Sequence, residues 1–297
     1  MRFRSQRVFF VLALLSFFYV GLFGVTSVFA EDASESAQTT TTVPAPSEQG
    51  PVSFSYFGTY VGPQMIQPLN KGSVNTTTLE YDEESPVYLN NQFKLDINLT
   101  SNLFVGPVVN FDMVPVAGKA FRALDSGIRI GHRNLIGRDD LSLMADLRVM
   151  VPLKKANRDN DEVVNLQSLQ ILTYKVPHTK LSLGFLGFHY YQIYGSNVPT
   201  RDPSSADDPK DLTLYLAPNI AYQFTETLAG VVYAEFYPYH LVGADASTFV
   251  HDPMDISPGV SWDVTPNFNV SPQLLLYPSR LAMDTVGTIV YLSATFL

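Results

Sequence analysis

The stretch SWDVTPNFNVSP (261–272) places two runs of alternating apolar and polar residues on either side of a three-residue turn at 265–267. Alternation with period two is typical of β-strands that have one apolar and one polar face. DINLTSNLFVGP at 96–107 matches the stretch position for position, down to the closing proline, and its centre recurs in YQFTETLAGV at 222–231. The sequence therefore predicts a chain built from repeated hairpins.

The same alternation continues along most of the chain, and the connections between strands alternate in length. Prolines recur too often for long helices. Short turns are expected at 100–102, about 134–139, 177–179, 225–227 and 265–267, with longer loops between them. Twelve strands are predicted, at about 52–61, 88–99, 103–113, 122–133, 140–152, 164–176, 180–194, 212–224, 228–240, 254–264, 268–278 and 286–297.

The N-terminal region has the features of an exported protein. Residues 1–30 have the pattern of a secretory signal peptide, with three arginines, an apolar core and the small-residue cleavage site VFA at 28–30. Residues 31–50 are rich in Ser, Thr, Ala, Pro and Glu and are expected to form a disordered linker. One domain, 51–297, is then left for the predicted strands.

Charge and cysteine content exclude several classes of function. Removal of the three signal-peptide arginines reduces 19 basic residues to 16, against 28 acidic ones, so the mature chain has a net charge of −12. This charge argues against nucleic acid as a partner. The chain has no cysteine, so disulfides, thiol chemistry and cysteine-ligated metal sites are excluded.

Two folds fit such strands: an exported soluble β-sandwich and a transmembrane barrel. The predicted strands run to about 10–12 residues, which suits a tilted bilayer crossing better than a soluble strand. Charges within the strands fall on the polar parity, and short turns alternate with long loops at an even strand count. These observations favour an all-β fold, a closed antiparallel up-and-down transmembrane β-barrel of about twelve strands.

The last strand, GTIVYLSATFL (287–297), resembles the C-terminal signal strand of Gram-negative outer-membrane β-barrel proteins. Tyr291 and Phe296 are the candidate assembly-signal residues, although such proteins end on the aromatic residue and here Leu297 follows it. The resemblance implies an outer-membrane location with both termini in the periplasm. It also implies contact with outer-membrane lipid, lipopolysaccharide and the barrel-assembly machinery.

Aromatic residues gather near the predicted strand ends, where a headgroup-level girdle is expected. The ordinary preference of aromatic residues for sheets is the alternative explanation. The candidate girdle residues are Tyr222, Phe224, Trp262, Phe268, Phe236 and Tyr237.

A barrel of twelve strands lies between small filled barrels and wide porins, so a narrow pore is expected. Charges of mixed sign in the lumen could create a transverse field for small polar solutes. The alternative is structural pairing: a turn near 136 would place Arg148 opposite Asp125, and Arg129 diagonal to Asp146. The candidate pore-lining residues are Lys94, Asp112, Asp125, Arg129, Asp146, Arg148, Tyr215, Tyr233 and Glu235.

Four prolines do not fit a regular barrel, because a closed sheet has no free edge where a missing N–H is harmless. Bulges or broken pairing are expected where they lie. These residues, on the lipid-facing parity, are Pro107, Pro218, Pro258 and Pro272.

The sequence favours a passive, porin-like channel for small hydrophilic solutes, without catalytic residues, cofactor or metal. Two other functions stay open. One is a hydrolase at the barrel rim, where His240, His251 and Asp255 share a long loop region and could converge. A surface adhesin or structural barrel would use the loop at 62–87 as its contact element.

Overall fold

The computed structural model describes residues 50–64, 73–74, 81–82, 87–114, 121–195, 209–283 and 285–296. The predicted signal peptide and almost all of the predicted linker lie outside these ranges, as does most of the 62–87 loop. Within the described residues, no helix is long and apolar enough to cross a membrane.

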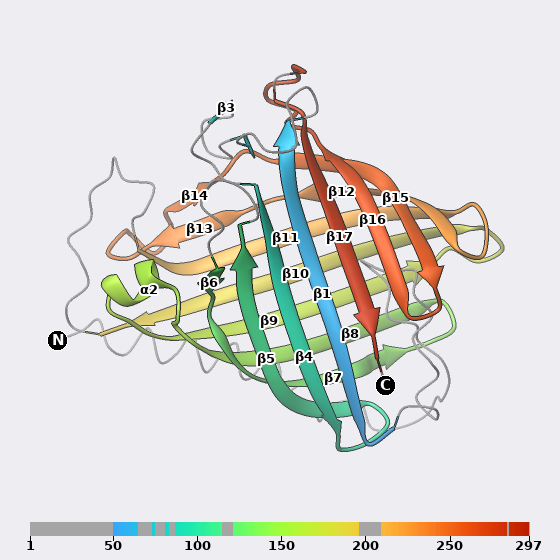
Figure 1. Cartoon of the computed structure of the whole chain (residues 1–297), viewed down its shortest axis with the longest axis horizontal. Helices are drawn as coiled ribbons and strands as arrows, with labels where there is room; N and C mark the ends of the chain where they lie inside the picture. The colour runs from blue at the N-terminus through green and yellow to red at the C-terminus, as the bar shows by residue number, and fades with distance from the viewer. Residues whose placement is uncertain are drawn as a thin grey trace.

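Twelve antiparallel strands form a closed barrel, which confirms the predicted fold. Each strand pairs with its neighbour along the chain, β10 pairs with β11, and the first strand pairs with the last (Figure 1). The strands are β1 (Val52–Gln64), β4 (Tyr88–Asn98), β5 (Leu103–Met113), β7 (Ser126–Gly137), β8 (Leu141–Val151), β9 (Glu162–Lys175), β10 (Leu181–Tyr194), β11 (Lys210–Gln223), β12 (Leu228–Glu235), β15 (Asp255–Thr265), β16 (Phe268–Leu275) and β17 (Gly287–Thr295).

Short elements lie outside this wall of twelve strands. The strand β6 pairs with β5, while β13 pairs with β11 and β14, so these extend the sheet beyond the barrel. A separate two-stranded sheet is formed by β2 and β3. Their bounds, with the one short helix, are β2 (Ser73–Val74), β3 (Tyr81–Asp82), β6 (Phe121–Ala123), α2 (Lys155–Asp159), β13 (Pro238–Leu241) and β14 (Phe249–His251).

Two predicted strands are each divided into two elements in the structure. The strand predicted at 122–133 is found as β6 and, from Ser126 to Gly137, β7, so the following turn is shorter than expected. The strand predicted at 228–240 is divided between β12 and β13. The break comes just before Pro238, which has no N–H to continue the ladder.

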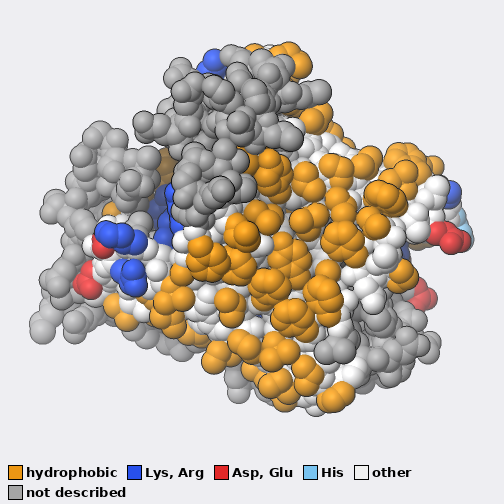
Figure 2. Space-filling view, viewed as in Figure 1, with side chains coloured by type: hydrophobic (Ala, Val, Ile, Leu, Met, Phe, Trp, Pro, Cys, Tyr) orange, Lys and Arg blue, Asp and Glu red, His pale blue; other side chains and the backbone are white. Residues whose placement is uncertain are grey.

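The outer wall of the barrel is apolar, as predicted from the alternation. Large apolar side chains that point away from the lumen stay exposed on most strands, and they cover much of the barrel surface in Figure 2. A closed barrel with such a wall is the architecture of outer-membrane β-barrel proteins, so the resemblance of the last strand is confirmed at the level of the fold. Members of this outward set include Ile97, Val109, Ile128, Ile130, Val149, Leu183, Phe185, Ile220, Val232, Val260, Trp262 and Val264.

The pairing is interrupted beside all four prolines, as predicted. The β4–β5 register skips Pro107, and the β11–β12 register stops at Asn219 and resumes only at Leu216, beyond Pro218. Between β15 and β16 the ladder is broken around Pro258 and Pro272. Each proline keeps its pairing on its other side, so the missing N–H disturbs one ladder only.

Gly106 precedes Pro107 at one of these gaps and allows a close approach of two backbones. A Cβ at Gly106 would lie 1.7 Å from the carbonyl oxygen of Leu95. We expect Gly106→Ala to lower the free energy of unfolding by about 1–3 kcal/mol, because backbone has to move. Urea unfolding in detergent measures this change.

Gly187→Ala is the matched control for Gly106→Ala. A Cβ there would meet side chains and no backbone: Gln170 Oε1 and Phe185 Cε1, both at 3.1 Å, and His189 Nε2 at 3.8 Å. Little change is expected there, and equal destabilisation by the two variants would contradict the close approach at Gly106.

Candidate pore lumen

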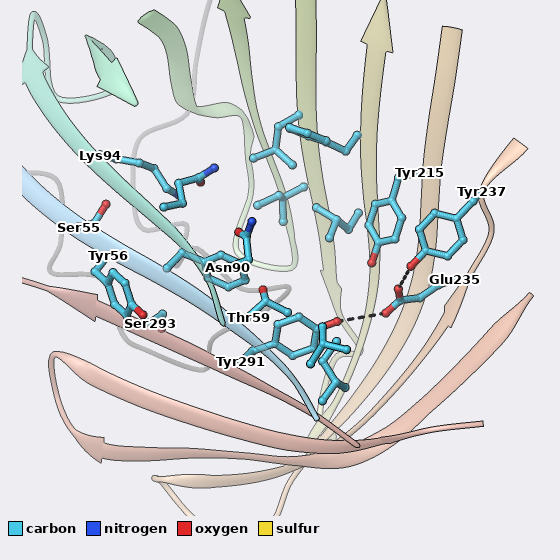
Figure 3. Close-up of a pocket in the computed structure, with 18 of the residues that line it drawn as sticks. Ser55, Tyr56, Thr59, Asn90, Lys94, Tyr215, Glu235, Tyr237, Tyr291 and Ser293 are labelled. Carbon is cyan, nitrogen blue, oxygen red and sulfur yellow. Dashed lines mark hydrogen bonds between the residues drawn. The ribbon is translucent and has the colours of Figure 1, made fainter. Parts of the chain in front are cut away.

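The interior of the barrel contains a cavity of about 700 Å³. Apolar side chains of β8, β9 and β10 form one part of its wall, beside Arg148 of β8, and polar side chains of β1, β4 and β17 form another; Figure 3 labels several of the polar ones. The apolar part is lined by Met144, Leu169, Ile171, Leu186 and Phe188. The polar part includes Ser55, Thr59, Asn90, Gln92, Lys94 and Ser293.

A buried ion-pair cluster joins β4, β7 and β8. Asp146 has 0% of its surface exposed and accepts from Arg129 Nη1 at 3.1 Å and from Arg148 Nε at 2.8 Å. Arg129 also donates from Nη2 to both carboxylate oxygens of Asp96, at 2.6 and 2.7 Å. Enclosed charges are stable only when paired in this way.

Aromatic rings complete the cluster. The guanidinium groups of Arg129 and Arg133 lie over the ring of Phe104, at 4.6 and 4.5 Å from its centroid. Arg148 lies over Phe188, 4.9 Å from the centroid. With Arg133 included, three guanidinium groups form ion pairs with the two carboxylates Asp96 and Asp146.

A carboxylate surrounded by tyrosines lies on another part of the wall. Glu235, 3% exposed, accepts hydrogen bonds from the hydroxyl groups of Tyr237 and, at 3.4 Å, Tyr291 (Figure 3). Tyr215 faces the same carboxylate, and its ring centroid lies 5.1 Å from that of Tyr237. In Figure 3, Lys94 lies across the cavity from this group.

Asp255 lies beside Glu235 and makes this region doubly acidic. The two residues are direct cross-strand partners between β12 and β15, and Asp255 is 4% exposed. Tyr277, 2% exposed, lies in the connection after β16 and also lines the cavity. Burial raises the pKa of Tyr277, and the negative charges of Asp255 and Glu235 raise it further, so its hydroxyl stays protonated.

The nine candidate pore-lining residues are distributed over several environments. Lys94, Arg148, Tyr215 and Glu235 line the cavity. Tyr233 packs in an apolar cluster with Leu186, Ala217 and Val231, while Arg129 and Asp146 belong to the ion-pair cluster.

Asp112 and Asp125 complete the set. Asp112 accepts a hydrogen bond from Asn90 at 3.0 Å. Asp125 accepts from the backbone N–H groups of Leu153 and Lys154 and from the side chain of Asn157. Asp125 therefore caps the start of the connection after β8 instead of pairing with a charge in the lumen.

The predicted charge pairing was right for one pair and wrong for the other. Arg129 pairs with Asp146, as expected, but Arg148 lies opposite Arg129 and bonds Asp146 instead of Asp125. The cause is the register of β7 and β8, because β7 extends to Gly137 and the register shifts between His132 and Ile136. The expected turn near 136 is too early.

The candidate girdle residues divide by strand face. Tyr222, Phe224, Trp262 and Phe236 are exposed, and alternation turns Phe268 outward as well. Tyr237 is the exception and corrects the prediction: it follows the outward Phe236, so it points inward, where it bonds Glu235. Of the two candidate assembly residues, Tyr291 is buried in the lumen and Phe296 is exposed beside Phe54.

The residues considered for a rim hydrolase lie in different surroundings. His240 Nδ1 lies 2.6 Å from Asp211 Oδ1, while His251 lies in β14 and Asp255 is buried beside Glu235. A Ser–His contact is found elsewhere: Ser168 Oγ lies 3.1 Å from His189 Nδ1. Both residues are on the outward parity, since their neighbours Leu169 and Phe188 line the cavity.

Sequence reasoning missed several residues of these two clusters. Asp96 and Asp255 were visible as charges on the polar parity, yet their partners depend on strand register. Tyr291 was visible on the polar parity of the last strand, but its contact with Glu235 was not, and Tyr277 gave no signal as a lumen residue. Among the described residues, no group of three His, Cys, Asp or Glu side chains is placed to hold a metal ion.

Comparisons with known proteins give a distant structural likeness. No protein-family model matches the chain. No curated protein matches it. Solved structures that resemble it include OmpF of Salmonella typhi in complex with daunomycin (9% identity, TM-score 0.40, 82% of this chain and 97% of that chain).

Two further solved structures, both of outer membrane channels, resemble this chain to a similar degree. The COG4313 outer membrane channel of Pseudomonas putida F1 has 9% identity and a TM-score of 0.47, over 82% of this chain and 94% of that chain. The outer membrane channel DcaP of Acinetobacter baumannii has 8% identity and a TM-score of 0.35, over 82% and 96%. At this distance, function has to be argued from the residues of the chain itself.

Proposed function

We propose that the protein is an outer-membrane channel through which small polar solutes pass. The observation that carries the proposal is the cavity of about 700 Å³ inside a closed barrel whose outer wall is apolar. Lysine and arginine side chains line one part of the cavity, and carboxylates line another. Such an arrangement produces a transverse field that orients small polar solutes.

In this proposal the short turns and both ends of the chain face the periplasm, and the long loops face lipopolysaccharide. Planar-bilayer recording of the purified protein tests the function directly. Stepwise conductance in potassium chloride is expected. A folded barrel that inserts but carries neither ions nor small solutes would overturn the channel.

Lys94 provides a test of the field inside the lumen. Its side chain lines the cavity on the side away from Glu235 (Figure 3). Lys94→Glu is expected to raise the permeability of potassium relative to chloride, because it reverses a charge in the lumen. The reversal potential in a salt gradient measures this ratio, and Lys180→Glu, an exposed residue at a short turn, is the matched control. A shift of the same size in both variants would contradict a lumenal role for Lys94.

A hydrolase acting at the barrel wall is the second candidate, favoured by the Ser168–His189 contact of 3.1 Å. A histidine beside a serine can activate its hydroxyl as a nucleophile. Ser168 is only 4% exposed, so a substrate would have to displace its neighbours. Labelling of Ser168 by a fluorophosphonate, in a protein without conductance, would favour the hydrolase over the channel.

A further inference from the structure

We infer that Glu235, Asp255 and the tyrosines around them form a binding site for the ammonium group of an organic cation. This inference rests on the proposed channel function and names a class of solute for the same lumen. Both carboxylates line the cavity, together with Tyr215, Tyr237, Tyr277 and Tyr291.

No ion pair among the described residues balances the negative charge of the two carboxylates. They are direct cross-strand partners, 3% and 4% exposed. Among the described residues, neither forms an ion pair with a lysine or arginine. Their partners are hydroxyl groups, from Tyr237 and Tyr291 to Glu235 and, at 3.4 Å, from Ser257 to Asp255. Two close buried carboxylates repel each other, and a bound cation would relieve that repulsion.

Tyr277 supplies an independent observation that points to a ligand. Its side chain is 2% exposed, lines the same cavity, and interacts electrostatically with Asp255 and Glu235. Its hydroxyl has no hydrogen-bond partner among the described residues. Buried hydroxyl groups in folded proteins are nearly always bonded, and a ligand in the cavity would supply the missing partner.

The chemistry of the site favours an organic ammonium over a metal ion. Hard divalent cations take six or more oxygen ligands, often from several carboxylates, whereas the described residues hold no group of three metal-type side chains. Aromatic rings attract ammonium groups through their faces, and four tyrosines gather here. The apolar wall formed by Met144, Leu169, Ile171, Leu186 and Phe188 would accommodate an apolar body attached to that ammonium.

Binding of phenethylammonium to the purified barrel in detergent, measured by calorimetry, tests the inference. Phenylpropionate, with a similar body and the opposite charge, is the matched probe. Wild-type protein is expected to bind the cation and not the anion. Glu235→Gln/Asp255→Asn is expected to weaken binding of the cation by at least about tenfold. Asp255→Asn alone replaces the double variant if the latter fails to fold, as judged by heat-modifiable migration in gels.

Asp263→Asn is the control variant, because Asp263 lies on β15 with Asp255 but bonds Asn269 at 2.8 Å and does not line the cavity. It should bind the cation as the wild type does. Unchanged binding in the double variant, or equal binding of the two probes by the wild type, would overturn the site.

Calorimetry and bilayer recording together test the binding site and the channel separately. Binding of the cation without conductance would support the binding site and contradict the channel function. Conductance without binding would support the channel function and contradict the binding site.

Discussion

Asp146→Asn is expected to lower the free energy of unfolding of the barrel by about 3–5 kcal/mol, the usual effect of removing one partner from a buried ion pair. Asp146 is fully buried and holds both Arg129 and Arg148. Its loss leaves Asp96 as the remaining carboxylate of the cluster for three guanidinium groups. Urea titration in detergent measures the change, with fluorescence of Trp262, the only tryptophan, as the signal.

The matched control is Asp159→Asn, which removes a carboxylate from an exposed ion pair with Lys155 on α2. Exposed pairs contribute little to stability, so the unfolding midpoint is expected to stay unchanged. If Asp146→Asn unfolded at the wild-type midpoint, the cluster would have no structural role, and its charges would be available to the pore.

Ile130→Arg is expected to destabilise the barrel by about 2–4 kcal/mol in lipid vesicles, the cost of an arginine that faces lipid near mid-depth. Ile130 lies in the middle of β7, points outward and is 47% exposed. Reversible urea unfolding in vesicles of phosphatidylcholine measures the change.

Thr59→Arg is its control, since Thr59 lies within β1 and faces the cavity (Figure 3). An arginine there can be hydrated or paired in the lumen, so a much smaller effect is expected. Equal costs for the two arginines would contradict the assignment of the outer wall to lipid.

The fold was predictable because it depends on a local pattern. Alternation with period two needs no knowledge of distant residues, and it located β4, β5, β8 and β15 within about one residue of their observed ends. The four prolines were informative for the same reason, since a missing N–H disturbs pairing wherever it lies in a closed sheet.

The lumen was less predictable because its contacts depend on register. One turn placed too early in the β7–β8 hairpin moved Arg148 from Asp146 to Asp125 in the prediction. The contact of Glu235 with Asp255 crosses a long loop, which leaves many registers open, and Tyr291 reaches Glu235 from the last strand. The strand face of each lumen residue could be assigned from its parity, but its contact partners could not.

The pairing of β1 with β17 has a consequence for how the barrel forms. Ser55 lies opposite Thr295, and the N–H of Phe296 donates to the carbonyl of Phe54, so the two ends of the domain meet. Loop-closure entropy grows only logarithmically with length, by about 0.6 kcal/mol per doubling. Pairing two strands so far apart in sequence therefore costs only slightly more free energy than closing a shorter loop. It requires, however, a conformational search over nearly the whole chain. Until β1 and β17 pair, one edge of each strand stays open to pairing with other chains.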